Sequence, residues 1–440
     1  MDKTIEKIVS LCKRRGFIFQ SSDIYGGFSA VYDYGPLGIE LKNNISQLWW
    51  KEMTRAHENI VGLDSGILMH PTIWEASGHV GAFNDPLVDC KQCKSRYRAD
   101  EFSDDFPSLN WTEIQCPKCG TTGDLTNPRQ FNLMFKTHAG PVEETGTEAF
   151  LRPETAQGIY VNYQLVQGAM RLKVPFGIAQ IGKAFRNEIV ARNFIFRTRE
   201  FEQMEMQYFV KPGTDDDIIQ EWKEKRFQFY INSLGIIPSR LRFHEHGENE
   251  LAHYAKEAWD IEYEFPFGWS EIEGIHNRTD FDLSRHQEFS GKNLSYFDQP
   301  NNERFLPYII ETSAGLNRML LTVLTDAYWE DKENNRIVMK FDPRIAPVKA
   351  VICPLVKKDG LPEKAREIMD ILKPHFKVIY DQQGSIGKRY YRQDEAGTPF
   401  GITVDHQSIN DNTITLRDRD TQKQDRLPID VLLNTIKSKI

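Results

Sequence analysis

Arginine and glutamate gather in one short stretch, residues 182–205 (GKAFRNEIVARNFIFRTREFEQME). Guanidinium groups pair bidentately with phosphate oxygens and also stack on flat rings. The mixture therefore suits a site that holds a triphosphate, a flat base and an amine together. Taken alone, the stretch is equally compatible with a solvated hairpin that carries weak surface ion pairs. The stretch contains Arg186, Arg197, Arg199, Glu188, Glu200, Glu202, Glu205, Phe185, Phe194, Phe196 and Phe201.

Two other segments place an acid immediately before an expected helix. LRPETAQG (151–158) sets Glu154 beside Arg152, and Thr155 could cap the helix that follows. ETSAGLNRMLLTVL (311–324) begins with Glu311 and small residues, and Arg318 then falls on the first turns of an apolar helix. A charge in such surroundings is seldom left unpaired, so we expect a phosphate or carboxylate partner; an internal salt bridge is the alternative.

Four of the six cysteines follow the spacing C-x2-C-x22-C-x2-C, as Cys90, Cys93, Cys116 and Cys119. The two thiolates of one pair can bind one side of a tetrahedral metal ion, and the two thiolates of the other pair can bind the opposite side. Disulfide pairing is the rival interpretation, and a reducing compartment disfavours it. The spacing predicts a closed, structural Zn²⁺ site.

These residues must be positioned by two kinds of architecture. Up to residue 342, aromatic-rich strands and helices alternate without a regular βαβ rhythm, which favours a mixed or antiparallel sheet. After that point strands and helices alternate regularly, as in a small α/β domain. We expect four segments: 1–85, a cysteine-containing insertion at 86–127, 128–342, and 346–440. In the last segment Lys388, Arg389, Tyr390, Tyr391 and Arg392 form a basic and aromatic cluster typical of RNA contacts, although a solvated helix face is an equal alternative.

Size and charge limit the class of protein. A chain of 440 residues is too long for one ordinary core. The net charge of −8 argues against non-specific coating of DNA or RNA. No run is long enough for a membrane span, and the charged N-terminus does not look like a signal peptide, so we expect a cytoplasmic protein.

Together these segments resemble the class II aminoacyl-tRNA synthetases. YDYGPLGIELKNNISQLWW is similar to the first, dimer-forming motif of that family, FRNEI with FRTREF to the second, and ETSAGLNR to the third. RPETAQG and YGPLG narrow the resemblance to the homodimeric glycyl-tRNA synthetases, over essentially the whole chain. The resemblance implies an α+β protein: an antiparallel-sheet catalytic domain with a four-cysteine, zinc-ribbon-like insertion, plus a C-terminal α/β anticodon-binding domain. The insertion occurs in only part of the family, so zinc rests on the spacing alone.

The resemblance also implies roles for particular residues. Arg186 would contact the α-phosphate of ATP, Glu188 the adenine amino group, and Phe201 the adenine ring. Arg318 would bind the γ-phosphate, and Glu271 would lie near ATP and its Mg²⁺. The full set implied for ATP is Arg186, Asn187, Glu188, Phe196, Arg197, Thr198, Arg199, Glu200, Phe201, Glu271, Ile272, Gly315, Leu316, Asn317 and Arg318, with Arg186 and Arg318 as catalytic residues. The set implied for glycine is Arg98, Glu154, Phe201, Glu202, Gln203, Met204, Glu205, Glu311, Thr312, Ser313, Ala314 and Gly315.

The implied reaction has two steps. Glycine and ATP form glycyl-adenylate and pyrophosphate, and glycine then passes to the terminal ribose of tRNA(Gly). Positioning and charge stabilisation would supply most of the rate. Two alternatives remain at this point: another class II synthetase, for threonine, proline or histidine, or a non-catalytic, synthetase-like subunit that binds tRNA. Such subunits commonly lose the ATP-binding arginines, which are present here.

Overall fold

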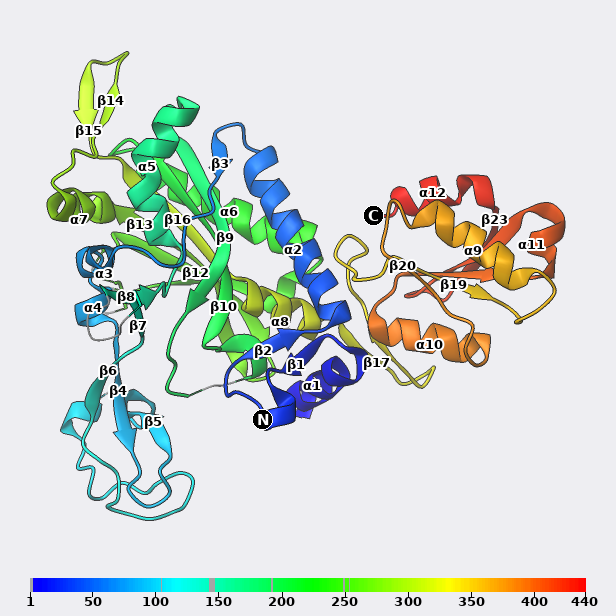
Figure 1. Ribbon diagram of the computed structural model, residues 1–440, viewed down its shortest axis with the longest axis horizontal. Helices are drawn as coiled ribbons and strands as arrows, with labels where there is room; N and C mark the ends of the chain where they lie inside the picture. The colour runs from blue at the N-terminus through cyan, green and yellow to red at the C-terminus, as the bar shows by residue number, and fades with distance from the viewer. Residues whose placement is uncertain (1–2, 104, 142–146, 191–192, 248–249, 253) are drawn as a thin grey trace.

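Figure 1 shows the computed structural model, which describes residues 3–103, 105–141, 147–190, 193–247, 250–252 and 254–440. A central body carries two appended parts. A lobe that contains the paired cysteines projects from one side, and a C-terminal domain lies beside the body at the opposite end. The prediction of several structural units is thus consistent with the arrangement.

A seven-stranded sheet forms the centre of the body, in the order β11-β12-β13-β16-β10-β9-β3. Neighbouring strands are antiparallel, except that β3 and β9 are parallel. This confirms the prediction of a mixed or antiparallel sheet. The strands are β3 (Ile60–Gly62), β9 (Phe176–Phe185), β10 (Glu200–Val210), β11 (Leu241–Glu245), β12 (Glu257–Phe265), β13 (Gly268–Thr279) and β16 (Tyr308–Gly315).

Helices cover both faces of this sheet. On one face, α2 (Pro36–Arg55), α6 (Asp215–Gln228) and α8 (Leu316–Ala327) pack with the strands into the largest hydrophobic core. In α2 the buried side chains recur every four residues, as expected for an amphipathic helix, and Pro36 occupies its first position. On the other face, α5 (Ala156–Met170) packs on β9 and β10, and α7 (Phe281–Ser290) packs on β13 and against α5.

Shorter elements complete the body. Helix α1 (Lys3–Arg15) packs against β1 and α8. The others are β1 (Ile18–Gln20), β2 (Tyr32–Tyr34), α3 (Pro71–Ala76), α4 (His79–Ala82), β7 (Phe135–Ala139), β8 (Thr147–Leu151), β14 (Tyr296–Asp298), β15 (Glu303–Phe305), β17 (Tyr328–Asp331) and β18 (Arg336–Met339). No helix within the described ranges combines the length and the apolar character that crossing a lipid bilayer requires.

The cysteine-containing lobe is built on a three-stranded sheet in the order β5-β4-β6. Its strands are β4 (Asn84–Asp89), β5 (Arg96–Arg98) and β6 (Arg129–Asn132). A small core separate from that of the body contains Val88, Trp111 and Leu125. Because this core is so small, the lobe needs a source of stability besides hydrophobic burial.

The C-terminal domain has a five-stranded sheet in the order β20-β19-β21-β22-β23. Its first two pairings are parallel and its last two antiparallel. The predicted α/β alternation is present, and α11 and β23 are additions that the sequence pattern did not indicate. The elements are β19 (Ala350–Pro354), α9 (Leu361–Leu372), β20 (Val378–Tyr380), α10 (Ile386–Ala396), β21 (Phe400–Val404), α11 (His406–Asp411), β22 (Thr413–Asp418), β23 (Gln424–Pro428) and α12 (Ile429–Lys437).

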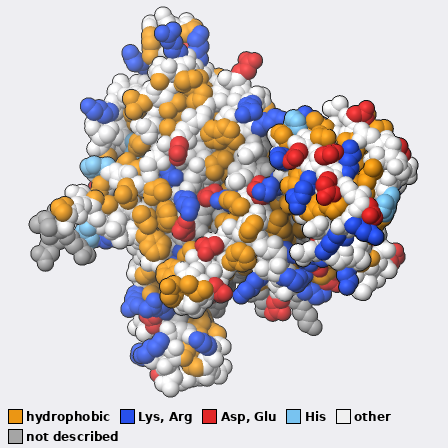
Figure 2. Space-filling view, turned by 45° about the vertical axis from the view of Figure 1, so that its right-hand side comes forward, with side chains coloured by type: hydrophobic (Ala, Val, Ile, Leu, Met, Phe, Trp, Pro, Cys, Tyr) orange, Lys and Arg blue, Asp and Glu red, His pale blue; other side chains and the backbone are white. Residues whose placement is uncertain are grey.

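The basic and aromatic cluster on α10 is divided between interior and surface. Arg389 is 3% exposed and donates to the carbonyl oxygens of Gly384 and Pro354, and the Tyr390 hydroxyl contacts Thr403. These two side chains therefore support the fold, so for Arg389 and Tyr390 both the interpretation as RNA contacts and the alternative of a solvated helix face are wrong. Lys388 and Tyr391 are exposed. Across the visible face of this domain, basic and acidic side chains are intermixed (Figure 2).

Candidate active site

One cavity of about 200 Å³ lies on the face of the sheet that also carries α5. The strands present their alternate residues to it. Glu205 of β10 pairs with Ser313 of β16, which in turn pairs with Gly274 of β13. One pleat further, Gln207 faces Glu311. Since side chains alternate between the two faces of a strand, these cross-strand rows form the floor of the cavity.

One end of the cavity is acidic. Glu154, Glu205 and Glu311 all line it, and Arg278 is the guanidinium group beside them. Arg278 Nη1 lies 3.1 Å from Glu311 Oε2, while its other nitrogens bond Asp282.

The three carboxyl groups differ in their protonation. Burial raises the pKa of Glu154, but His79 and Arg278 together bring it down to about 2. Burial is likewise opposed at Glu311, where Arg278 and His276 hold the pKa well below its ordinary value. Burial raises the pKa of Glu205 well above its ordinary value, and the charges of Glu311 and Glu154 add to that effect. The acidic end thus contains two ionised carboxylates beside a third that tends to keep its proton.

The other end combines guanidinium groups with aromatic rings. Arg186 lies over the ring of Phe201, with its guanidinium carbon 5.4 Å from the ring centroid, and Arg318 lies over Phe196 at 4.4 Å. Arg318 Nη1 is also 2.9 Å from Glu271 Oε2, and this contact lowers the pKa of Glu271 against the effect of burial. The arrangement offers cationic donors and flat surfaces side by side, which suits a nucleotide.

The elements that carry these groups follow from the local sequence. β16 ends at Gly315, and α8 begins directly at Leu316. Arg318 therefore stands on the first turn of the helix, beside the end of this central strand. β9 and β10 form the predicted pair of strands, and the loop between them returns Phe196, Arg197 and Thr198 to the cavity. The interpretation of residues 182–205 as two strands joined by a loop is confirmed.

Comparisons with known proteins agree with this geometry. Residues 114–327 match the family model described as "tRNA synthetase class II core domain (G, H, P, S and T)", and residues 349–439 match "Anticodon binding domain". The chain is 60% identical to a glycine–tRNA ligase of Treponema denticola, over 99% of this chain and 97% of the relative. A glycine–tRNA ligase of Borrelia hermsii is 56% identical over the same shares, and one of Thermobifida fusca is 51% identical over 97% of this chain and 96% of its own length.

The chain belongs to the glycine–tRNA ligase family. The resemblance inferred from the three motifs is therefore confirmed, and so is the expected class II core with an anticodon-binding domain. The chain is an aminoacyl-tRNA ligase, and the interpretation as a non-catalytic subunit is set aside.

The structure places many of the residues implied by the family resemblance around the cavity of this ligase. Each contributes to one of the two ends or to the floor between them. They are Glu154, Arg186, Glu188, Phe196, Arg197, Thr198, Phe201, Gln203, Glu205, Glu271, Glu311, Ser313, Gly315, Asn317 and Arg318.

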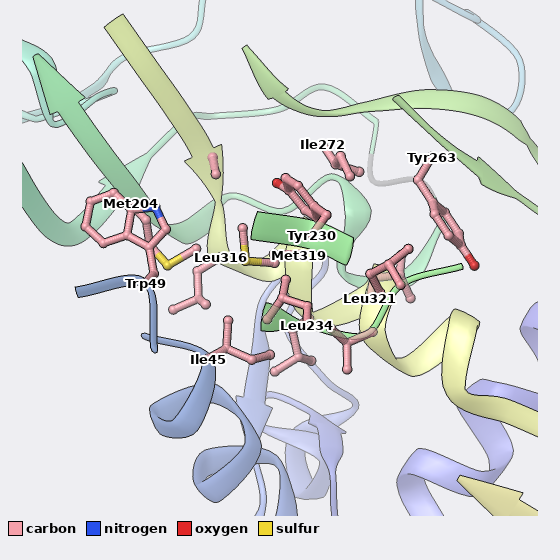
Figure 3. Close-up of a cluster of buried hydrophobic side chains, with 14 of the residues drawn as sticks. Ile45, Trp49, Met204, Tyr230, Leu234, Tyr263, Ile272, Leu316, Met319 and Leu321 are labelled. Carbon is pink, nitrogen blue, oxygen red and sulfur yellow. The ribbon is translucent and has the colours of Figure 1, made fainter. Parts of the chain in front are cut away.

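Strand alternation turns other implied residues away from the cavity. Met204, Ile272 and Leu316 are almost completely buried in the large core on the opposite face of the sheet, where Figure 3 shows them among Trp49 and Met319. Ala314 belongs to the same core, and Thr312 is fully buried at the intervening position of β16. Contact of these side chains with a ligand in the cavity is therefore not supported.

Four charged or polar residues of the implied sets make structural contacts outside the cavity. Glu202 pairs with Lys42 of α2 at 2.6 Å, and Glu200 pairs with Lys183. Arg199 donates to the backbone oxygens of Glu188 and Ser29. The backbone nitrogen of Asn187 donates to the carbonyl oxygen of Leu133, and the side chain does not line the cavity.

Arg98, also implied for glycine, stands on β5 of the lobe. Its guanidinium lies 3.0 Å from Asp85 and 2.6 Å from Asp100. These two carboxylates pair with the positive charge of Arg98 in this conformation. Arg98 lies outside the cavity lining.

Sequence reasoning missed Tyr254, Gly274, His276 and Arg278, all of which line the cavity. Tyr254 lies under the Arg278 guanidinium at 3.8 Å, and His276 Nδ1 is 3.0 Å from Glu311 Oε2. A Cβ on Gly274 would lie 2.9 Å from His276 Nε2, so glycine keeps this part of the floor open. The sequence signal that could have identified them is the two-residue alternation along β13, which places Gly274 and His276 on the same face of the strand.

The four cysteines of the lobe converge. Their sulfur atoms all lie within 4.8 Å of one another, with Cys90 3.7 Å from Cys119 and Cys93 3.7 Å from Cys116. A disulfide requires about 2.05 Å between sulfurs, so neither pair is bonded. Sulfurs at the corners of a zinc tetrahedron with bonds of about 2.3 Å are about 3.8 Å apart. The donor set therefore fits a four-coordinate metal ion.

Proposed function

We propose that this protein activates glycine with ATP and transfers it to the 3′-terminal ribose of tRNA(Gly). The observation that carries the proposal is the cavity that combines a cationic, aromatic end with an acidic end. Near-full-length identity to glycine–tRNA ligases adds independent support.

In the proposed complex the nucleotide occupies the aromatic end. Phe201 would stack on adenine, Glu188 would accept from its amino group, and Arg186 would hold the α-phosphate. Arg318, already stacked on Phe196, would hold the γ-phosphate. Arg197 and Thr198 would close over the nucleotide from the loop. Because these groups are fixed before reaction, they stabilise developing charge without reorganisation.

The acidic end would take the ammonium group of glycine. Glu154, Glu205 and Glu311 supply negative charge, and Ser313 and Gln203 line the same region. The carboxylate of glycine would then point toward the α-phosphate, and its attack would release pyrophosphate. Glu271 would help to hold Mg²⁺ beside the nucleotide, and the ion would supply positive charge that offsets the charge of the phosphates. In the proposed complex the small cavity would leave no room for a larger side chain, so we infer that no editing domain is needed.

Pyrophosphate exchange with each of the twenty amino acids tests this proposal. We expect exchange with glycine and at least about 100-fold weaker exchange with alanine, because a clash adds to the small effect of one methyl group. Comparable exchange with alanine, or stronger exchange with another amino acid, would refute the assignment of substrate. An assay of tRNA charging with the same enzyme then tests the second step.

Zinc is the proposed occupant of the four-cysteine site. Cys90, Cys93, Cys116 and Cys119 would bind one Zn²⁺, which supplies a closed structural cross-link rather than catalysis. Tyr97 donates toward Cys116 Sγ at 3.3 Å, and the backbone nitrogen of Cys93 toward Cys90 Sγ at 3.5 Å, contacts that stabilise thiolates. Emission spectroscopy should find about one zinc per chain. Its absence from freshly purified protein would contradict the assignment.

We also infer a homodimer, in the cytoplasm where translation takes place. The apolar stripe of α2 is used within the chain, so α2 alone does not supply the interface. Ile24, Tyr25 and Phe28, just before β2, are 89%, 87% and 55% exposed and offer apolar surface for a second copy. Light scattering should give the dimer mass, and Ile24→Asp should shift it toward the monomer. An unchanged dimer in that variant would place the interface elsewhere.

A further inference from the structure

The acidic end of the cavity holds more negative groups than the neighbouring cation can neutralise. Arg278 makes two hydrogen bonds to Asp282 and one to Glu311. His276 adds a contact to the same oxygen of Glu311. The charge of Arg278 is thus directed to Asp282 and Glu311. The second buried cation nearby, Arg152, acts on Glu205 only through space, because its hydrogen bonds go mainly to backbone carbonyl oxygens.

Glu205 is surrounded by neutral partners. The Thr155 hydroxyl donates to its Oε2, and the Gln207 amide nitrogen lies 3.3 Å from its Oε1. That same nitrogen lies 2.9 Å from Glu311 Oε1, so one amide group bridges the two carboxyl groups. Within the described part of the chain no ion pair reaches Glu205, which is 1% exposed. A buried carboxyl group in such a position retains a proton.

The charges facing Glu205 from the surrounding elements agree with this. Burial and the charges of Glu311 and Glu154 raise the pKa of Glu205, while Arg278 and His276 lower that of Glu311 against the effect of burial. Opposite shifts in neighbouring carboxyl groups are typical of a pair that holds one proton. The titratable and charged groups around the pair are Arg152 and Glu154 before α5, Tyr160 on α5, His79 on α4, Tyr254 before β12, His276 and Arg278 on β13, and Asp282 and His286 on α7.

We propose that Glu205 and Glu311 hold one proton between them in the empty cavity, and that the ammonium group of glycine replaces that proton on binding. This inference rests on the proposed function. On binding, the O–H bond of the Glu205 carboxyl group breaks and the proton passes to bulk solvent, while the ammonium group keeps its three N–H bonds. The ammonium charge then compensates the newly ionised carboxylate, so the net charge of the acidic end is unchanged, while the carboxylate of glycine lies toward the cationic end of the cavity.

The exchange makes glycine binding dependent on pH. Below the apparent pKa of the pair, each rise of one pH unit should increase the association constant about tenfold, because one proton is released per glycine. Above that pKa the dependence disappears. The proton exchange also explains why the site would reject ligands of glycine's size that lack an ammonium group. Such a ligand brings no positive charge to replace the proton.

Titration calorimetry with glycine in two buffers of different protonation enthalpy tests the exchange. At about pH 6 we expect release of about one proton per glycine, seen as a difference in observed heat between the buffers. Glycine binding with the same heat in both buffers would overturn the inference and leave the proposed function intact. Failure of glycine to bind at all would refute the proposed function instead.

Two variants separate proton exchange from a general loss of acid. Glu205→Gln removes the group that carries the proton, and we expect weaker binding, no proton release and a flat pH profile. Glu154→Gln is the matched control: Glu154 is already ionised, so binding should weaken while a proton is still released, with the pH dependence shifted to lower pH because the charge of Glu154 no longer raises the pKa of Glu205. Proton release retained in Glu205→Gln would overturn the inference. The unmodified protein decides the question by itself if a variant fails to fold.

Discussion

Two clusters of buried charge in this molecule differ in how completely they are neutralised. At the junction with the C-terminal domain, Arg336 pairs with Asp331 at 2.8 Å and with Asp394 at 2.6 Å. Arg417 pairs with Asp394 at 2.8 Å, and Arg419 donates to backbone oxygens and to Asp420. The junction arginines thus all have partners.

The active-site cavity lacks this balance. No ion pair of Arg186 is present among the residues that the structure describes, and three carboxyl groups crowd one cation at the opposite end. Arginines with complete partners connect parts of a fold, whereas uncompensated groups of both signs await a ligand that supplies the missing charges. Arginine content alone does not separate the two cases.

The largest expected effect is on chemistry. Arg186→Ala should slow glycine-dependent pyrophosphate exchange by about 100- to 1,000-fold, since one preorganised cation beside the transferred phosphate is lost. The melting temperature should barely change, because Arg186 has no ion-pair partner to abandon in the described structure.

Arg199→Ala is the matched control for that variant. Arg199 lies in the same loop but contacts backbone oxygens outside the cavity, so exchange should fall by less than about tenfold. Equal losses of exchange rate in the two variants would show that a position in the cavity lining does not give Arg186 a special role.

The next effect is on stability. Arg336→Met should destabilise the folded chain by about 3 kcal/mol, because two buried aspartates lose a partner. Urea unfolding measures the loss, and exchange by the folded fraction should stay near normal. Adding Asp331→Asn should restore part of the stability, because Asp331 has no other ion pair in the described structure, and strict additivity of the two changes would argue against a coupled junction.

Glu205→Gln should produce a smaller change of opposite sign. A raised pKa in the folded state means that Glu205 contributes stability at low pH, which is lost as pH rises through that pKa. Glutamine mimics the protonated form at every pH. The variant should therefore melt a few degrees above the unmodified chain at about pH 8, with the difference closing near pH 5. A variant that melts lower at both pH values would contradict this account.

The smallest effect concerns the surface of α10. Lys388 is exposed, in contrast to Arg389 beside it. Lys388→Glu should raise the KM for tRNA by a few-fold through one lost phosphate contact, with pyrophosphate exchange unaffected. An unchanged KM would remove Lys388 from the proposed RNA contacts.

Much of this site could be predicted from sequence because its motifs carry rare residue types in a fixed order. Arg186, Arg318, Glu154 and the cysteine pairs belong to this group. Strand alternation was also readable: along β10, Gln203 and Glu205 face the cavity, whereas the residue between them is in the core. Treating the segment as a contiguous set of contacts ignored its two-residue period.

Other assignments needed the fold. Arg389 and Tyr390 look like RNA-binding residues in sequence, yet the turn of α10 directs them inward. Arg278 lies near the end of β13 in a segment without a recognisable motif, and its importance arises only when α7 brings Asp282 and β16 brings Glu311 to its guanidinium. Spacing along the chain carries no information about contacts formed between distant strands.

The sequence by itself determined the family, the order of the motifs, the four metal-type cysteines and the residues able to bind a nucleotide, because residue chemistry is local. Only the tertiary structure decided which acids are ionised and which arginines have partners. The protonation of a carboxyl group depends on burial and on charges a few ångströms away, and in this site those charges come from several segments that are distant in sequence, among them β10 and β16, whose residues Gln207 and Glu311 are 104 positions apart.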